Sequence, residues 1–151
     1  MITSRRSKFG GHTFDEEIEG RVDDLQLDEK DPGMMVEIAR EDFGLEGDDL
    51  ARGVRAILLA LMKAGARPGV YSRGTPEKYI LLPGYGETPE EITDTLMRHY
   101  QENGYPKIYK GGCTLILQEW FKDRRTAEDI VRGEEREREQ RALAELYRKK
   151  D

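Results

Sequence analysis

The sequence predicts an α+β fold, in which two main helices pack on a small antiparallel sheet of three to four strands. An N-terminal arm and a charged C-terminal helix flank this core. Three observations predict it: two segments with the apolar spacing of a helix, several short runs rich in β-branched and aromatic residues, and polar segments at both ends. The main helices are expected at 49–64 and 88–103. The strands are expected at 70–73, 78–83, 107–110 and 113–121.

The helix at 49–64 has the clearest pattern, because its apolar residues recur on one helical face. These residues are Leu50, Val54, Ile57, Leu58, Leu61 and Met62. Asp48 or Asp49 is a suitable N-cap, and Gly65 is a suitable residue to follow its end. A shorter helix is expected to begin at Pro32, with Asp31 as its N-cap.

The helix at 88–103 has a start signal of three residues. Thr88 is expected as N-cap, Pro89 as the first helical residue, and Glu91 as the partner that completes a capping box. Asn103 and Gly104 are typical of a helix end.

The strand predictions depend on short β-prone runs. The runs at 70–73 and 78–83 flank a segment rich in turn residues and are therefore expected to form a β-hairpin. The run at 113–121 has apolar residues on both faces, which is typical of a central strand.

Composition predicts how the chain is organised. Charged residues make up 37% and apolar residues 36%, whereas average globular domains have roughly 25% and 45–50%. The polar residues gather at the ends, so we expect a polar N-terminal arm at 1–31, an α+β core domain at 32–121 and a charged helix at 122–151. The arm is either disordered or ordered against its own core or a partner.

Charge and cysteine content limit the class of protein. The net charge of −6 argues against general nucleic-acid binding but leaves room for a local basic face. Cys113 is the single cysteine, so no intrachain disulfide is expected. The longest apolar run, 56–62, is too short to span a bilayer. We therefore expect a cytoplasmic protein that does not bind membranes.

The chemistry-bearing residues form no recognisable motif. Cys113 and His99 have no spacing that brings a nucleophile to a base. With His12 they supply three nitrogen or sulfur donors, fewer than the four of a structural zinc site. We expect no catalytic residue, no metal and no cofactor.

The function that remains is a non-enzymatic protein-interaction module, for example an inhibitor, an immunity protein, an adaptor or a small assembly subunit. Its size, acidity and order of elements are similar to those of small bacterial immunity and inhibitor proteins. The expected partner is another protein, and a basic one suits the acidic chain. The expected contact residues lie on the two terminal arms and are Phe9, Phe14, Ile18, Leu143, Leu146 and Tyr147.

Two other functions stay open. The first is nucleic-acid binding through a basic face made of Arg52, Arg55, Lys63, Arg67, Arg73 and Lys78. The second is a small enzyme that uses Cys113 or a carboxylate in a cleft.

Overall fold

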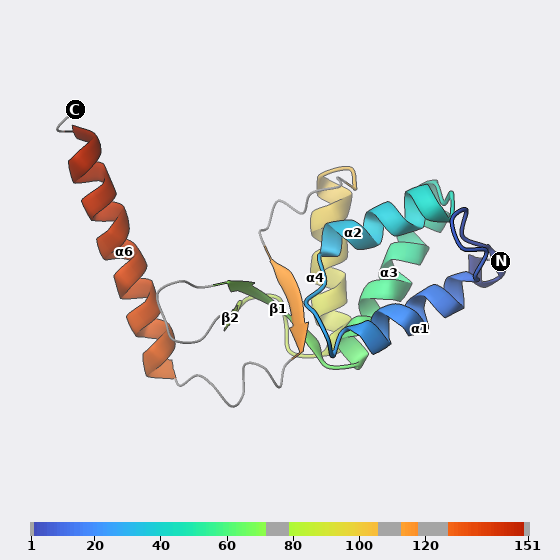
Figure 1. The fold of residues 1–151 in the computed structure, drawn as a ribbon, viewed down its shortest axis with the longest axis horizontal. Coiled ribbons are helices and arrows are strands. Elements are labelled where there is room, and N and C mark those ends of the chain that lie inside the picture. The colour runs from blue at the N-terminus through green and yellow to red at the C-terminus, as the bar shows by residue number, and fades with distance from the viewer. Residues whose placement is uncertain (1, 72–78, 106–112, 118–126, 150–151) are drawn as a thin grey trace.

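The helices α1 to α4 gather on one side of a small sheet, and α6 stands apart from them (Figure 1). The computed structural model describes residues 2–71, 79–105, 113–117 and 127–149. Besides a short 3₁₀ turn at Ile2–Ser4, the elements are α1 (Phe14–Asp24), α2 (Pro32–Glu37), a π-helical segment (Ile38–Asp42), α3 (Gly47–Lys63), β1 (Ala66–Tyr71), β2 (Tyr79–Leu81), α4 (Pro89–Glu102), β3 (Thr114–Leu117) and α6 (Ala127–Lys149). This arrangement confirms the predicted α+β class.

Helix α3 is the centre of the core and contacts α1, α2, α4 and β1. Its buried residues are Leu50, Gly53, Val54, Ile57, Leu58, Leu61 and Met62. The structure assigns the N-cap to Glu46, so Asp48 and Asp49 lie in the first turn, where their charge favours the helix dipole. Gly65 follows the C-cap with a φ of +105°, which is the role predicted for it.

Helix α2 begins as its sequence predicts. The Asp31 side chain accepts a hydrogen bond from the Gly33 N–H at 2.8 Å, and Pro32 is the first helical residue. The chain then continues as one π-helical segment, in which the Phe43 N–H donates to the Ile38 carbonyl at 3.3 Å. This segment brings Phe43 into the core.

Helix α4 begins at the predicted residue but is capped differently. The Thr88 hydroxyl accepts from the Glu91 N–H at 3.2 Å, as expected of an N-cap. The Glu91 carboxylate, however, accepts from the Glu87 N–H at 3.0 Å and not from Thr88, so the predicted capping box is wrong. The cause is Gly86, whose φ of +120° turns the chain against Glu91 so closely that a Cβ there would lie 2.7 Å from the Glu91 Cβ.

The sheet has the strand order β2-β1-β3, and both pairs are antiparallel. Strand β1 begins at Ala66, earlier than predicted, because residues 66–69 pair with β3. Pro68 is tolerated in this central strand because its missing N–H falls opposite Leu82, just beyond the end of β2. The Leu82 N–H donates to the Pro68 carbonyl at 3.0 Å.

Among the described strands, β3 lies at an edge of the sheet and pairs only with β1, which differs from the central strand predicted at 113–121. Leu115 is fully buried in the core, and on the side of β3 away from β1 its backbone pairs with Lys30 in a single β-bridge, with N–H to carbonyl distances of 2.8 and 2.9 Å. The strand predicted at 107–110 and the parts of the predicted strands at 72–73, 78 and 118–121 lie outside the described residues.

The N-terminal segment packs against the core, which is one of the arrangements that the sequence leaves open for residues 1–31. Helix α1 packs on α3, with Phe14 and Leu25 fully buried and Ile18 and Val22 half-buried against the core. The physical reason is spacing: these four apolar residues share one face of a helix, so even a polar segment buries them.

Close packing at Gly53 leads to a test with a matched control. A Cβ at position 53 would lie 2.5 Å from the Leu45 Cδ1 and 3.3 Å from the Phe14 Cζ, whereas a Cβ at Gly20 would meet nothing within 4 Å. Gly20→Ala should therefore stabilise the chain by about 0.5–1 kcal/mol. Gly53→Ala should destabilise it by about 1 kcal/mol, because overpacking outweighs the gain in helix propensity. Urea unfolding measures both, and equal stabilisation by the two variants would contradict this packing.

The ion pair between Asp24 and Lys30 predicts a pH effect. The Lys30 side chain is nearly buried, and its hydrogen bond and charge hold the pKa of Asp24 below the ordinary 3.8. A carboxyl whose pKa is lower in the folded chain adds stability above its unfolded pKa and loses it as pH falls through the folded pKa. Asp24→Asn should therefore destabilise the chain at pH 7 and lose less stability than the wild type below pH 3.8. Urea unfolding across this range measures it, and the exposed Asp23→Asn is the control, expected to follow the wild type.

Candidate protein-interaction site

The residues predicted to contact a partner are placed very differently by the structure. Phe9 is 82% exposed, whereas Phe14 is 1% exposed. Ile18 is half-buried against the core. Phe14 is thus a core residue, because the helical face that carries it packs on α3, and its prediction as a partner contact is corrected.

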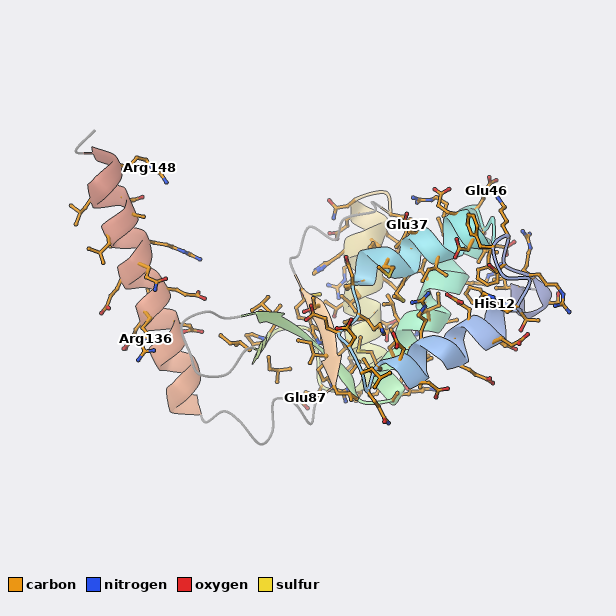
Figure 2. All side chains as sticks on the ribbon, viewed as in Figure 1. His12, Glu37, Glu46, Glu87, Arg136 and Arg148 are labelled. Carbon is orange, nitrogen blue, oxygen red and sulfur yellow. The ribbon has the colours of Figure 1, made fainter. Side chains whose placement is uncertain are left out.

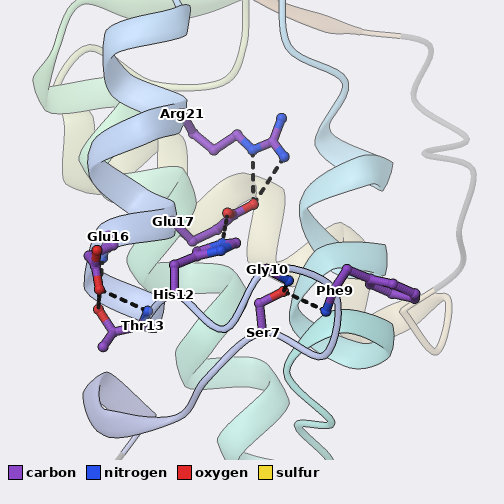
Figure 3. A network of polar contacts seen from close by, with 8 residues as sticks. All are labelled: Ser7, Phe9, Gly10, His12, Thr13, Glu16, Glu17 and Arg21. Carbon is purple, nitrogen blue, oxygen red and sulfur yellow. Dashed lines mark hydrogen bonds and ion pairs between the residues drawn. The ribbon is translucent and has the colours of Figure 1, made fainter.

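Phe9 lies on a loop at residues 7–11 whose backbone is fixed by hydrogen bonds. The buried Ser7 hydroxyl accepts from the N–H groups of Phe9 and Gly10, at 3.2 and 3.4 Å (Figure 3). The Ser7 N–H donates to the His12 carbonyl at 2.8 Å, and the Gly11 N–H donates to the Ser7 carbonyl at 3.0 Å. Gly11 has a φ of +69°, which a glycine adopts without strain. The Gly10-Gly11 pair, a break in the sequence pattern, therefore forms a defined turn.

A second group of side chains joins this loop to α1. The His12 Nε2 lies 2.5 Å from the Glu17 Oε2, and the Arg21 guanidinium donates twice to the Glu17 Oε1, at 3.0 and 3.1 Å (Figure 3). Glu17 is buried, the Arg21 guanidinium balances its charge, and the His12 ring contacts its other carboxylate oxygen. Thr13 and Glu16 form a capping box at the start of α1, and the Thr13 N–H and hydroxyl hold the pKa of Glu16 below its ordinary value.

The loop also rests on the π-helical segment. The Lys8 N–H donates to the Asp42 carbonyl at 2.9 Å, and the His12 ring meets Phe43 edge-on at 5.8 Å. Phe43 in turn packs edge-on against Phe14 at 5.0 Å. Burial and the nearby charge of Glu17 raise the pKa of Asp42. The chain thus holds the loop from two elements while Phe9 remains exposed.

The C-terminal helix carries the other predicted contacts. Leu143 and Leu146 are 53% and 58% exposed, and the side chain of Tyr147 lies outside the described residues. Figure 2 shows Arg136 and Arg148 on α6, apart from His12 and from Glu37 of α2. Residues 134–146 are exposed except for the half-buried Glu137. The structure does not bring this helix together with Phe9.

The predicted basic face is divided. Arg52 and Arg55 line a groove between α3 and α4, to which α4 adds Arg98, a residue that the sequence does not single out. Arg67 instead donates to the carbonyl of Met62 at the end of α3 and to that of Ala66 at the start of β1, at 3.0 and 2.6 Å. Lys63 is exposed outside the groove, and Arg73 and Lys78 lie outside the described residues.

Cys113 is placed as a core residue. It is 5% exposed, and burial raises the pKa of its thiol to about 12, more than a hydrogen bond with the Tyr85 side chain lowers it. Tyr85 also packs edge-on against His99, at 5.9 Å. A thiol with this pKa is protonated at neutral pH and is a poor nucleophile.

The rest of the described structure offers no metal site and no membrane-spanning helix. Among the described residues, no group of three or more His, Cys, Asp or Glu side chains is placed to hold a metal ion. The same part of the chain has no helix with the length and apolar composition needed to cross a bilayer. No protein-family model matches the chain, and neither a curated protein nor a solved structure does.

The sequence analysis did not predict several residues that support the Phe9 loop. The signal for the capping box was present, because Thr13 and Glu16 have its spacing. His12 and Glu17 are five residues apart, a spacing that does not predict a contact along a helix. The Ser7 hydroxyl meets the Phe9 N–H only when the chain has formed the turn. Spatial contact was needed to identify them.

The burial of Cys113 predicts that it resists thiol reagents. In the folded chain at pH 8, iodoacetamide should leave Cys113 unmodified, because the thiol is buried and protonated. Unfolding in urea should allow full modification, which intact-mass spectrometry measures. Leu27→Cys is the matched control, since position 27 is 81% exposed and should react in the folded chain. Rapid labelling of native Cys113 would restore the cysteine-enzyme alternative.

Proposed function

We propose that the protein is a non-enzymatic protein-interaction module that uses the Phe9 loop as its main contact. The observation that carries the proposal is a phenylalanine that is 82% exposed on a loop fixed by its own hydrogen bonds. Aromatic side chains are enriched among the few residues that dominate binding energies at protein interfaces.

The rigidity of the loop supports this reading of Phe9. Binding costs free energy when a loop must be ordered, and a loop that is already fixed avoids most of that cost. Ser7 holds the loop from within. Glu17 of α1 contacts the adjoining His12, and the carbonyl of Asp42 in the π-helical segment accepts from the Lys8 N–H. The Phe9 ring takes part in none of these contacts. The turn therefore does not require that Phe9 be exposed.

Charge around the loop indicates what a partner presents there. Arg5, Arg6 and Lys8 are exposed beside Phe9, in a chain whose net charge is −6. Arg6 donates to the Gly11 carbonyl at 2.7 Å, and Arg5 reaches the Phe43 carbonyl at 3.5 Å. A partner that receives Phe9 in an apolar pocket with an acidic rim complements this surface.

Helix α6 is proposed as a second contact. An isolated helix in water gains little from propensity alone and usually depends on packing of an apolar face. The exposed Leu143 and Leu146 provide a small face of this kind. Deleting residues 126–151 should weaken partner binding and leave the described core elements intact, because no described residue of α6 belongs to the core. Deleting residues 1–30 would remove Phe14 and Leu25 from the core and therefore cannot separate binding from folding.

A comparison of two exposed apolar residues tests the proposal. Affinity purification from the native host, followed by quantitative mass spectrometry, should recover a partner with the wild type and with Leu27→Ala, but much less with Phe9→Ala. The two residues are equally exposed, at 82% and 81%, so the loss of general surface hydrophobicity is matched. With the partner in hand, Phe9→Ala should weaken binding about tenfold or more. Circular dichroism should show that both variants are folded.

One result of this purification would contradict the proposal. Recovery of the same partners at the same abundance with Phe9→Ala and the wild type would show that the loop is not the contact.

A further inference from the structure

A groove of about 400 Å³ lies between α3 and α4 and is independent of the Phe9 loop. It is lined by Ala51, Arg52 and Arg55 from α3, and by Asp94, Met97, Arg98 and Gln101 from α4. We infer that this groove binds a short, carboxylate-rich segment of a partner protein.

The position of the arginines follows from how the two helices pack. The apolar faces of α3 and α4 meet in the core, through residues such as Leu58 and Leu96. Residues next to a buried helical stripe lie at the rim of the contact. Arg52, Arg55 and Arg98 occupy such rim positions on the two helices, so tertiary packing brings together cations that are far apart in the sequence.

The charges in the groove are not balanced. Arg55 donates to Asp94 at 2.7 Å. Arg52 is 70% exposed and lies 4.0 Å from Asp49, the outer limit of an ion pair. Arg98 is exposed and forms no ion pair with any other residue that the structure describes. The lining of the groove therefore has three cations and one carboxylate, Asp94, with Asp49 beside it, and an added carboxylate would give Arg98 a partner.

The chemistry of the lining favours a carboxylate. A guanidinium presents a planar fork of donors that fits the two oxygens of a carboxylate. Met97 is nearly buried, and Ala51 is half-buried, so the groove also has an apolar part. Gln101 adds an amide that donates hydrogen bonds. Glutamate or aspartate next to a small apolar residue matches this lining.

A nucleic acid fits the same surface less well. Binding along a phosphate backbone needs a continuous basic track. Arg67 is directed to carbonyls at the end of α3 and the start of β1, and Lys63 lies outside the groove. The groove thus offers room for a few acidic side chains, in a chain whose net charge is −6.

Fluorescence anisotropy with three probes tests the inference. The probes are a labelled peptide of repeated Glu-Glu-Leu, the same peptide with Gln in place of Glu, and a labelled single-stranded DNA of mixed sequence. The full-length chain should bind the Glu peptide more tightly than the other two, and salt should weaken this binding between about 20 and 150 mM. Arg98→Glu should reduce affinity for the Glu peptide about tenfold or more.

Matched variants separate the groove from the general surface. Arg148→Glu makes the same charge change on α6 and should bind the Glu peptide like the wild type. Phe9→Ala should also bind it like the wild type, so failure of the groove and failure of the Phe9 loop are distinguishable. Arg98 is exposed, and thermal unfolding should show that Arg98→Glu is folded.

Four results would overturn the inference. They are no binding of the Glu peptide, equal binding of the Gln peptide, tighter binding of the DNA, and equal weakening by Arg148→Glu. Sedimentation velocity adds a fifth: self-association of the wild type that Arg98→Glu abolishes would make a second copy of the chain the occupant.

Discussion

Burial of the apolar face of α3 is the constraint on which the rest of the structure depends. This helix touches α1, α2, α4 and β1, so each of those elements has a position because α3 offers it apolar surface. The approach is closest at Gly53, where Leu45 and Phe14 occupy the space that a side chain would fill. In a chain with only 36% apolar residues, gathering them around one helix gives a core that scattered contacts would not.

The same packing determines which parts of the surface can act. By burying Phe14 and Leu25, α3 fixes α1, and α1 in turn holds His12 through Glu17. The loop at 7–11 is thereby attached to the core while Phe9 is left in solvent. Helix α3 also packs against α4, and this contact places Arg98 beside Arg52 and Arg55. Both proposed binding surfaces are consequences of how α3 is covered.

The charged residues have at least three distinct roles. Glu17 and Lys30 are buried and paired, so they fix the positions of neighbouring segments. Arg67 and Glu91 bind backbone groups at helix ends. Residues 134–146 of α6 are exposed apart from the half-buried Glu137, and none of them belongs to the described core. An acidic net charge therefore says little about function until each charge has been placed.

The sequence by itself determined the local elements: the α3 stripe, the starts of α2 and α4 at Asp31 and Thr88, and the α+β class. These depend on residues within one or two turns, and a single sequence contains that information. It also named Phe9, together with five other residues, as a candidate contact, and the structure leaves Phe9 exposed. Contacts in the folded chain were needed to place Phe14 in the core, Lys30 beside β3 and Arg98 beside Arg52. Each of these depends on a contact between segments distant in the chain, which neither periodicity nor local capping chemistry encodes.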